Sequence, residues 1–240
     1  MVTKGGWTPK LSLDVDSRRA KAAKIATLVE RRRPLRGATL LEVGTGAGVI
    51  ATLLADHVGP EGTVVSVDVQ DLRTVTDGYQ FELVDGPHLP FPVGSFDVVV
   101  SNHTIEHVGG PVEQSVHLCE LARILRPGGV GYVASPSRWA VVEPHFKVPF
   151  LSWLPVAVRT PALRASGRGS VYDISPRTRR EMRDLIARAG LRATDVTADA
   201  VQAVAELEPG GAGRVASRVP GAVVRAGRHL MPTMVFVVHR

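Results

Sequence analysis

The sequence predicts an α/β fold in which a doubly wound, mostly parallel sheet carries helices on both faces. The first observation is a succession of short runs rich in Val and Leu, at residues 38–43, 63–68, 79–84, 96–101 and 129–134. These runs are mostly continuous rather than alternating, which is typical of strands buried on both faces of a parallel sheet. The second observation is that helical patterns at residues 47–57 and 112–125 separate some of these runs, which indicates βαβ units.

Further elements flank this central region. A helix is expected from Asp16 or Ser17 to about Arg33, where Pro34 follows. Another is expected at residues 177–190, with Ser175 as its N-cap. The remaining predicted elements are strands at 191–197 and 232–239 and a loop at 209–213. Only ten residues separate the second predicted strand from the third, so we expect no full helix there.

Composition bounds the class of protein. The 240 residues are 44% hydrophobic, enough for one substantial core, and we expect a single domain over residues 1–240. Cys119 is the only cysteine, so no intrachain disulfide can form, and a packed thiol is expected there. No apolar run resembles a signal peptide or approaches a membrane span. These features predict a soluble, cytoplasmic protein.

The net charge of +6 is unevenly placed along the chain. Residues 37–158 carry thirteen acidic against five basic side chains, whereas both flanks are basic. A basic flank can bind nucleic acid or an anionic membrane surface. The basic stretches lack interleaved aromatic residues that would stack on bases, and this pattern favours solvated helix faces over nucleic-acid binding.

A glycine-rich loop follows the first predicted strand and opens a helix. It reads Glu-Val-Gly-Thr-Gly-Ala-Gly over residues 42–48, and Asp68 ends the next strand twenty residues after Gly48. Glycines let a ligand approach the main chain, and a carboxylate at that strand end can accept hydrogen bonds from ribose hydroxyls. The pair indicates an adenosine-containing cofactor. Val49 stands where a dinucleotide fingerprint has its third glycine, which argues against a nicotinamide cofactor.

The loop closely resembles motif I of the class I S-adenosylmethionine-dependent methyltransferases. Further blocks stand in that family's order, namely residues 85–91, 94–101, 106–107 and 125–129. The resemblance covers roughly residues 38–134. It implies a Rossmann-like, seven-stranded sheet of order 3-2-1-4-5-7-6 and S-adenosylmethionine as cofactor.

The resemblance also implies roles for individual residues. The glycine loop would pack against the methionine part and ribose of the cofactor, and Glu42 would hold that loop or the amino group. Asp68 would take the ribose hydroxyls, Val69 would lie against the adenine, and Asp85 with Gly86 would meet the edge of the adenine. The expected cofactor-binding residues are Glu42, Gly44, Thr45, Gly46, Gly48, Asp68, Val69, Asp85, Gly86 and Asn102.

Methyl transfer from a sulfonium mainly requires alignment, which can supply about 7–11 kcal/mol. A general base adds about 10²–10⁴-fold and is needed only where the acceptor loses a proton. In the family, the loop after the fourth strand lies beside the transferred methyl group. Here that loop makes His103 the first candidate base and Glu106 the second, whereas His107 can simply fix the loop. His88 and His117 are expected on surfaces, and no metal is expected.

A long segment follows the fifth strand. Residues 136–173 hold five of the twelve aromatic side chains, namely Trp139, Phe146, Phe150, Trp153 and Tyr172. Loops this long inside a domain are usually lids or binding elements, and in the family an insertion here resembles a substrate cap. His145, in the run from Glu143 to Lys147, offers a second base or an anchor. Packing of these aromatics onto the sheet is an equally weighted alternative.

The sequence therefore divides into four expected parts: an N-terminal helix (1–36), a cofactor-binding core (37–134), a substrate-cap insertion (135–174), and a C-terminal helix with a strand hairpin (175–240). The expected function is methyl transfer from S-adenosylmethionine to oxygen, nitrogen or carbon of a small molecule bound under the cap, in a natural-product or glycan pathway. The alternatives are a nicotinamide-dependent oxidoreductase, an RNA methyltransferase and a non-catalytic cofactor-binding protein. The oligomeric state stays open.

Overall fold

The computed structural model describes residues 15–207 and 220–240. The loop expected at residues 209–213 and the start of the chain lie outside these ranges. Seven strands form one sheet of order β3-β2-β1-β4-β5-β7-β6, which confirms the predicted topology. The strands are β1 Thr39–Val43, β2 Thr63–Asp68, β3 Gln80–Leu83, β4 Phe96–Asn102, β5 Leu125–Pro136, β6 Arg192–Asp195 and β7 Thr233–His239. β7 runs antiparallel to both of its neighbours, β5 and β6, and the other strand pairs of this sheet are parallel.

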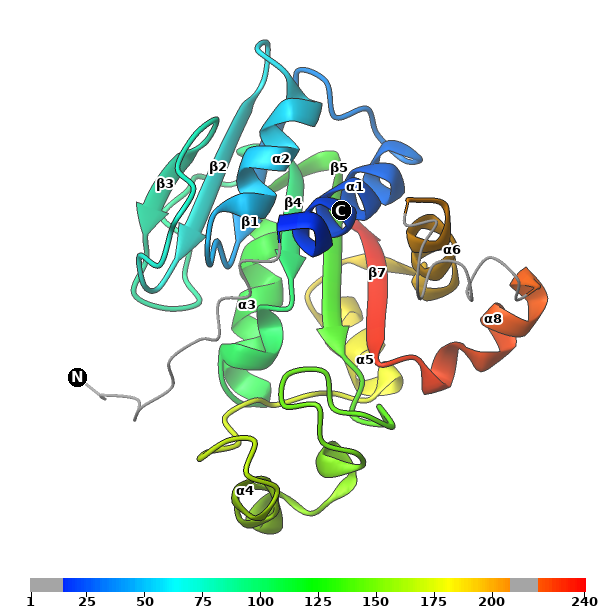
Figure 1. Ribbon diagram of the computed structural model, residues 1–240. Helices are drawn as coiled ribbons and strands as arrows, with labels where there is room; N and C mark the ends of the chain where they lie inside the picture. The colour runs from blue at the N-terminus through cyan, green and yellow to red at the C-terminus, as the bar shows by residue number, and fades with distance from the viewer. Residues whose placement is uncertain (1–14, 208–219) are drawn as a thin grey trace.

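Helices cover both faces of the sheet (Figure 1). One face packs against α1 (Val15–Glu30), α2 (Val49–Val58) and α6 (Thr197–Leu207) in a shared apolar cluster. The other face packs against α3 (Pro111–Ile124) and α5 (Arg179–Arg188). This two-sided cover explains why the strand sequences are continuously apolar, since side chains pointing either way are buried.

Two boundaries differ from those that the sequence predicts. The expected turn at residues 126–129 lies within β5, which begins at Leu125 and shifts register against β4 between Phe96 and Val98. The N-cap of α5 is Thr178 rather than Ser175. Its hydroxyl accepts a hydrogen bond from the backbone N–H of Glu181 at 3.2 Å, and Glu181 completes a capping box.

Of the connections near the two edges of the sheet, one matches the prediction and one differs from it. The short link from β2 to β3 contains no helix, as predicted. The strands β6 and β7 do pair antiparallel, but they are not joined as a hairpin. The described residues between them include α6, α8 (Gly221–Gly227) and a short 3-10 turn, and α6 packs back onto α1.

The buried face of α3 differs from the predicted one, and this corrects the expected burial of His117 and Cys119. Its buried stripe includes Gln114, His117 and Leu118, so His117 faces the sheet rather than solvent. Its Nε2 lies 3.0 Å from Ser101 Oγ on β4, and burial lowers the pKa of His117 to about 4. Cys119 is exposed instead of packed, since it lies outside the buried stripe. His88 is exposed, as expected.

Asp97, from one of the family-like blocks, has a structural role at the amino end of β4. Its carboxylate accepts hydrogen bonds from Arg33 and Arg126, each at 2.6 Å, and from the backbone N–H of Thr39 at 3.0 Å. Burial opposes ionisation, but these donors hold its pKa below the ordinary value. Asp97 thus links the region after α1 to β1, β4 and β5, far from the edge where the site lies.

The carboxyl ends of the parallel strands meet at the lower edge of the sheet in Figure 1. Beyond that edge lies the segment that follows β5, which includes α4 (Val156–Ala165). We call residues 137–178 the cap segment. Ligands of open α/β sheets bind at this edge, so the topology places the cap segment over the expected site.

Candidate active site

The glycine-rich loop bends into the conformation that its three glycines permit. Gly44, Gly46 and Gly48 have φ angles of 92°, 52° and 83°, a region that favours glycine, and Gly48 is the N-cap of α2. A side chain at Gly44 would collide with Thr104, and one at Gly48 would collide with Tyr79. A Cβ at Gly46 would meet nothing within 4 Å. The loop therefore packs tightly at both ends and opens to free space at its middle.

Asp68 closes this loop from the end of β2. One carboxylate oxygen accepts a hydrogen bond from the backbone N–H of Gly46 at 2.9 Å, and the other accepts one from the N–H of Val69 at 2.7 Å. Asp68 is half-buried, and Val69 beside it is 58% exposed. The carboxylate thus lies at the open side of the loop with lone pairs left for a ligand.

A buried polar cluster supports the loop from below. Ser66 donates a hydrogen bond to Glu42 Oε2 at 2.9 Å, and its hydroxyl lies 2.6 Å from the Thr45 hydroxyl. All three side chains are buried. Burial raises the pKa of Glu42 to about 8, so its carboxyl group is mostly protonated at neutral pH. Ser66 was not predicted from sequence, because it lies inside a strand with no motif around it.

The remaining predicted cofactor residues lie along the same edge. Asp85 and Gly86 follow β3, and Asp85 is exposed. Asn102 ends β4. Its Oδ1 atom is buried without a hydrogen-bond partner among the described residues, so it is an acceptor available to a ligand.

The loop after β4 contains a histidine–carboxylate pair. His103 Nδ1 lies 3.1 Å from Glu106 Oε1, and His103 Nε2 lies 3.5 Å from the Thr233 hydroxyl. The His103 side chain is 27% accessible, whereas Glu106 is buried. A carboxylate only accepts hydrogen bonds, so Glu106 favours the tautomer with the proton on Nδ1 and a lone pair on Nε2.

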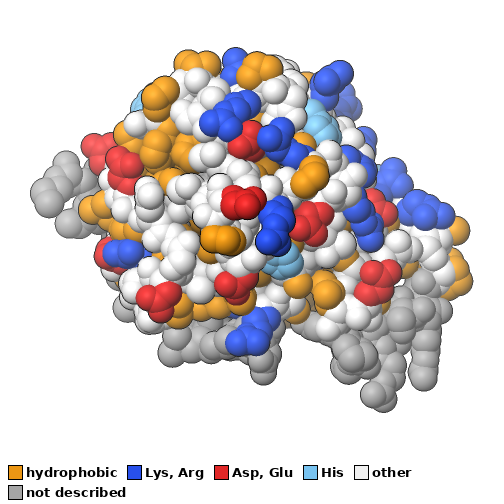
Figure 2. All heavy atoms as spheres, turned by 90° about the horizontal axis from the view of Figure 1, so that it is seen from above, with side chains coloured by type: hydrophobic (Ala, Val, Ile, Leu, Met, Phe, Trp, Pro, Cys, Tyr) orange, Lys and Arg blue, Asp and Glu red, His pale blue; other side chains and the backbone are white. Residues whose placement is uncertain are grey.

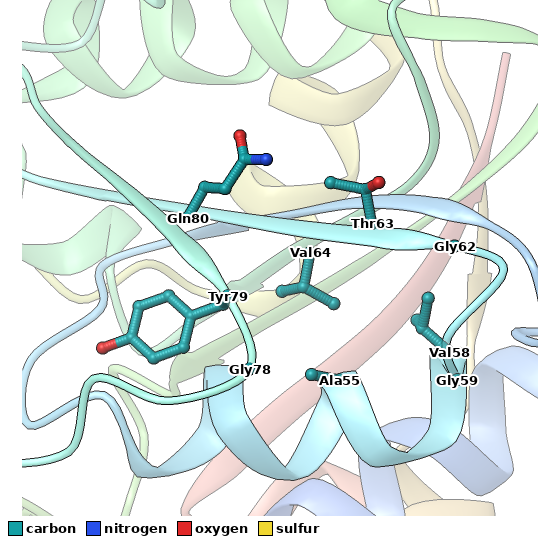
Figure 3. Close-up of a pocket in the computed structure, with 9 residues that line it drawn as sticks. All are labelled: Ala55, Val58, Gly59, Gly62, Thr63, Val64, Gly78, Tyr79 and Gln80. Carbon is teal, nitrogen blue, oxygen red and sulfur yellow. The ribbon is translucent and has the colours of Figure 1, made fainter.

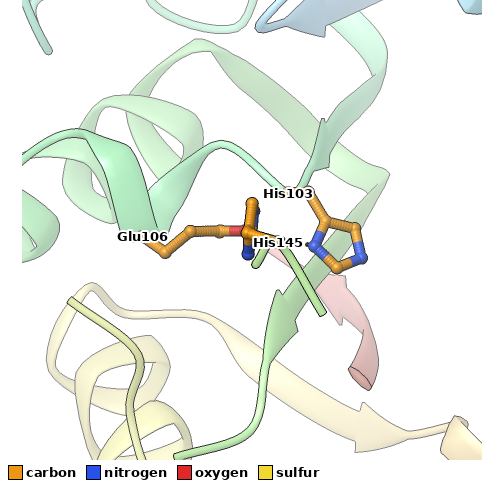
Figure 4. Close-up of side chains that lie close together, drawn as sticks. All are labelled: His103, Glu106 and His145. Atoms are coloured by element: carbon orange, nitrogen blue, oxygen red, sulfur yellow. Dashed lines mark hydrogen bonds and ion pairs between the residues drawn. The ribbon is translucent and has the colours of Figure 1, made fainter. Parts of the chain in front are cut away.

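The cap segment contributes a second histidine to this pair (Figure 4). His145 Nε2 lies 3.4 Å from Glu106 Oε1, and His145 Nδ1 lies 3.0 Å from Glu143 Oε1. Burial disfavours the charged imidazole, but hydrogen bonds to Glu106 and Glu143 outweigh it and raise the pKa of His145 to about 9. Burial likewise opposes the charge of Glu106, yet hydrogen bonds from His103 and His145 lower its pKa to about 2. His145 is therefore a cation at neutral pH, held between two carboxylates.

The same cluster has the composition of a metal site. His103, Glu106 and His145 each offer one ligand atom, and these atoms lie within 4.8 Å of one another. Glu106 Oε2 is also buried without a partner in the part of the chain that the structure describes. Histidine nitrogen and carboxylate oxygen suit a divalent transition metal. The hydrogen bonds and ion pairs within the cluster satisfy the other contacting atoms without one.

One residue that sequence reasoning missed connects the two groups. Thr104 lies between His103 and Glu106 in sequence, donates a hydrogen bond to the carbonyl of Val43 at 2.7 Å, and would contact any side chain at Gly44. The histidine–carboxylate pair is therefore joined to the glycine loop through a direct contact. The only signal in the sequence that could have identified Thr104 is its position after the fourth strand.

A hollow of about 340 Å³ lies elsewhere, at the amino ends of β2 and β3 against the end of α2 (Figure 3). Its lining includes Val58, Val64 and several glycines, and Tyr79 is the only titratable side chain among the lining residues. Tyr79 donates its hydroxyl proton to the carbonyl of Val75 at 2.6 Å. This hollow lacks the acids and bases that the opposite edge of the sheet provides, so we assign the site to the carboxyl edge.

Solved structures identify the class of fold. A SAM-dependent methyltransferase from Aquifex aeolicus superposes with a TM-score of 0.58 over 97% of each chain, at 17% sequence identity. At that identity the likeness concerns the fold alone. Together with the strand order and the glycine loop, it defines a Rossmann-like methyltransferase fold.

Residues 41–133 carry the methyltransferase domain that is typical of the class I S-adenosylmethionine-dependent methyltransferases. They match the family model described as a methyltransferase domain. A probable S-adenosylmethionine-dependent methyltransferase of Mycolicibacterium smegmatis is 36% identical over 42% of this chain and 39% of its own length. Nocamycin O-methyltransferase of Saccharothrix syringae is 34% identical over 51% of this chain and 48% of its own. The chain thus spans less than half the length of each relative, and the matched region favours a methyltransferase over an oxidoreductase.

Proposed function

We propose that the protein transfers a methyl group from S-adenosylmethionine to a hydroxyl or phenol oxygen of a small molecule bound beneath the cap segment. The observation that carries this proposal is the contact of 3.1 Å between His103 Nδ1 and Glu106 Oε1. Oxygen acceptors lose a proton on methylation, and a histidine oriented by a carboxylate is suited to take it. The match to an O-methyltransferase supports the same acceptor atom.

The residues present fit the family's cofactor. Gly46 faces open space, Asp68 can accept bonds from ribose hydroxyls, and Asn102 Oδ1 can accept one from the cofactor's ammonium group. Val69 would flank the adenine, and Asp85 with Gly86 would meet its edge. When bound, S-adenosylmethionine supplies a methyl group on a sulfonium, which is activated for in-line displacement by the acceptor oxygen.

The protein's own contribution is positioning and proton removal. His103 Nε2 accepts the acceptor's proton, and buried Glu106 stabilises the imidazolium that results. His145 is less suited to this task, because its pKa of about 9 leaves it protonated at neutral pH. We assign His145 to hold Glu106 and dock the cap segment onto the loop after β4.

A matched pair of acceptors tests the proposed function. A phenol and the aniline of the same scaffold would be incubated with the protein and methyl-labelled S-adenosylmethionine, and the products identified by mass spectrometry. We expect methyl ether from the phenol, at a rate that depends on His103. Transfer to the aniline alone, or transfer that requires an added divalent metal ion, would contradict the assigned chemistry.

Asp68→Ala is expected to weaken S-adenosylmethionine binding by about 1.5–3 kcal/mol, because each hydrogen bond to a charged carboxylate contributes that much. The corresponding loss is one to two orders of magnitude in Kd, measurable by calorimetry. Asp71→Ala is the matched control, since Asp71 is an exposed carboxylate three residues away that pairs with Arg73. An unchanged affinity in the Asp68 variant would remove this residue from the site.

Cofactor affinity should rise with pH up to about 8 if Glu42 faces the cofactor's positive charge. The pKa of Glu42 is about 8 without ligand, so a cation must displace its proton below that pH. Binding at pH 7 should release about one proton per cofactor, detectable by calorimetry in buffers of different ionisation enthalpy. Glu42→Gln should abolish the release attributable to this group. Equal release in both proteins would show that Glu42 does not respond to the cofactor.

A further inference from the structure

The cap segment exposes a cluster of apolar side chains. We call Trp139, Val141, Val142, Phe150 and Trp153 the cap patch, and each of the five is 40–49% exposed. The rings form one cluster, because the centroid of Trp153 lies 5.7 Å from that of Trp139 and 5.0 Å from that of Phe150. Contiguous exposed apolar surface of this kind usually marks an interaction site.

The backbone holds these side chains in place rather than leaving them loose. The N–H of Phe150 donates to the carbonyl of Val141 at 2.7 Å, and Trp153 Nε1 donates to the carbonyl of Ala140 at 2.9 Å. Phe150 has a φ angle of 57°, which is unfavourable for a bulky residue. The neighbouring Leu151 and Ser152 are buried. The backbone at Phe150 is therefore strained, although the side chain of this residue is exposed to solvent.

The cap segment carries more basic than acidic side chains at its surface. The acidic residues of the cap segment are Glu143, which is buried and bonded to His145, and Asp173, which is exposed near the C-terminal end of the segment. The cap segment also has basic side chains at its surface, namely Arg138, Lys147, Arg164 and Arg168. The guanidinium of Arg138 lies 5.8 Å from the ring of Trp139, and Arg168 donates to the carbonyl of Lys147 at 2.6 Å. By contrast, acidic and basic side chains intermingle on the face seen from above in Figure 2.

We propose that the cap patch docks on the surface of an anionic lipid bilayer. Trp and Phe side chains partition into the boundary between headgroups and acyl chains, and basic side chains beside them attract anionic headgroups. Among the described residues, no helix has the length and hydropathy of a membrane span. Exposed aromatic side chains, on a segment whose surface is more basic than acidic, fit that boundary in both polarity and charge.

Such docking would place the site at the membrane surface. His145 lies between Val142 and Phe150 in sequence and contacts Glu106 of the core. An amphiphilic acceptor leaving the bilayer would therefore meet the cap segment first. This inference goes beyond the proposed function and does not depend on which atom is methylated.

Co-sedimentation with vesicles tests the proposal without cofactor or acceptor. We expect the protein to bind vesicles of phosphatidylcholine mixed with phosphatidylglycerol, with a blue shift of Trp emission, and to bind phosphatidylcholine alone far more weakly. Replacing Trp139 and Trp153 together by Ser should reduce binding by about tenfold or more, because both apolar anchors are lost. Val93→Ser, which removes an exposed apolar side chain near the amino end of β4, should have no effect.

A second set of variants tests the role of the basic side chains by reversing their charge. Arg164→Glu combined with Arg168→Glu should weaken binding to the anionic vesicles and reduce its salt dependence, whereas Arg36→Glu at the opposite edge should do neither. Retained S-adenosylmethionine binding would show that the variants fold. Absence of vesicle binding by the unmodified protein would overturn the proposal. So would a dimer in light scattering that the Trp variant dissociates, because the patch would then join two copies of the chain. Neither result would bear on methyl transfer.

Discussion

Replacing His103 by Asn is expected to lower kcat by about 10²–10⁴-fold with an oxygen acceptor, the usual contribution of a general base. Asn suits this position because His103 has a φ angle of 58°, which Asn tolerates better than most residues. The cofactor affinity should stay nearly unchanged, because we assign His103 to the acceptor rather than to the cofactor. The acidic limb of the pH profile of kcat should disappear, since no imidazole is left to be protonated. Steady-state kinetics across pH would measure both effects.

Two further variants separate the base from the groups that position it. Glu106→Gln keeps a hydrogen-bond acceptor for His103 but removes the charge that stabilises the imidazolium, so we expect a smaller loss of kcat that retains an acidic limb. His145→Ala should affect the docking of the cap segment more than proton removal. If His145→Ala abolished turnover while His103→Asn stayed within a few-fold of the unmodified protein, the base would lie in the cap segment instead.

Gly46→Leu is expected to abolish detectable S-adenosylmethionine binding. A side chain at this position meets no protein atom within 4 Å, so it would project into the open space that we assign to the cofactor. The φ angle of 52° also imposes a penalty of about 1–2 kcal/mol on any L-residue. Calorimetry for binding and thermal unfolding for stability would measure the two effects separately.

Gly37→Leu is the matched control for the strain. Gly37 has a φ angle of 71°, and a Cβ at this position would likewise meet no atom within 4 Å, but Gly37 lies before β1 at the opposite edge of the sheet. Both variants should lose similar stability, and only the Gly46 variant should lose the cofactor. Equal binding by the two proteins would show that the open space at Gly46 is not the cofactor site.

Local sequence predicted the sheet well. Continuous Val and Leu runs identify strands buried on both faces, and the glycine loop and Asp68 need only short spacings to be recognised. The parts that failed depend on register and distant packing. A small error in the position of the α3 stripe exchanges the predicted environments of His117 and Cys119, since these two residues point about 200° apart on a helix. The helices between β6 and β7 have no motif, and their packing onto α1 shows only in three dimensions.

The strand order, the cofactor loop and the candidacy of His103, Glu106 and His145 could all be predicted from the sequence, because each follows from a contiguous motif or from a family resemblance. Which of these residues lie together depends on the packing of distant segments. Glu106 and His145 are far apart in the chain, and only the return of the cap segment over the sheet edge brings them to 3.4 Å. Burial and the second carboxylate of Glu143 then set the charge of His145, and the two carboxylates outweigh burial. Such coupling depends on dielectric and distance, which no linear motif encodes.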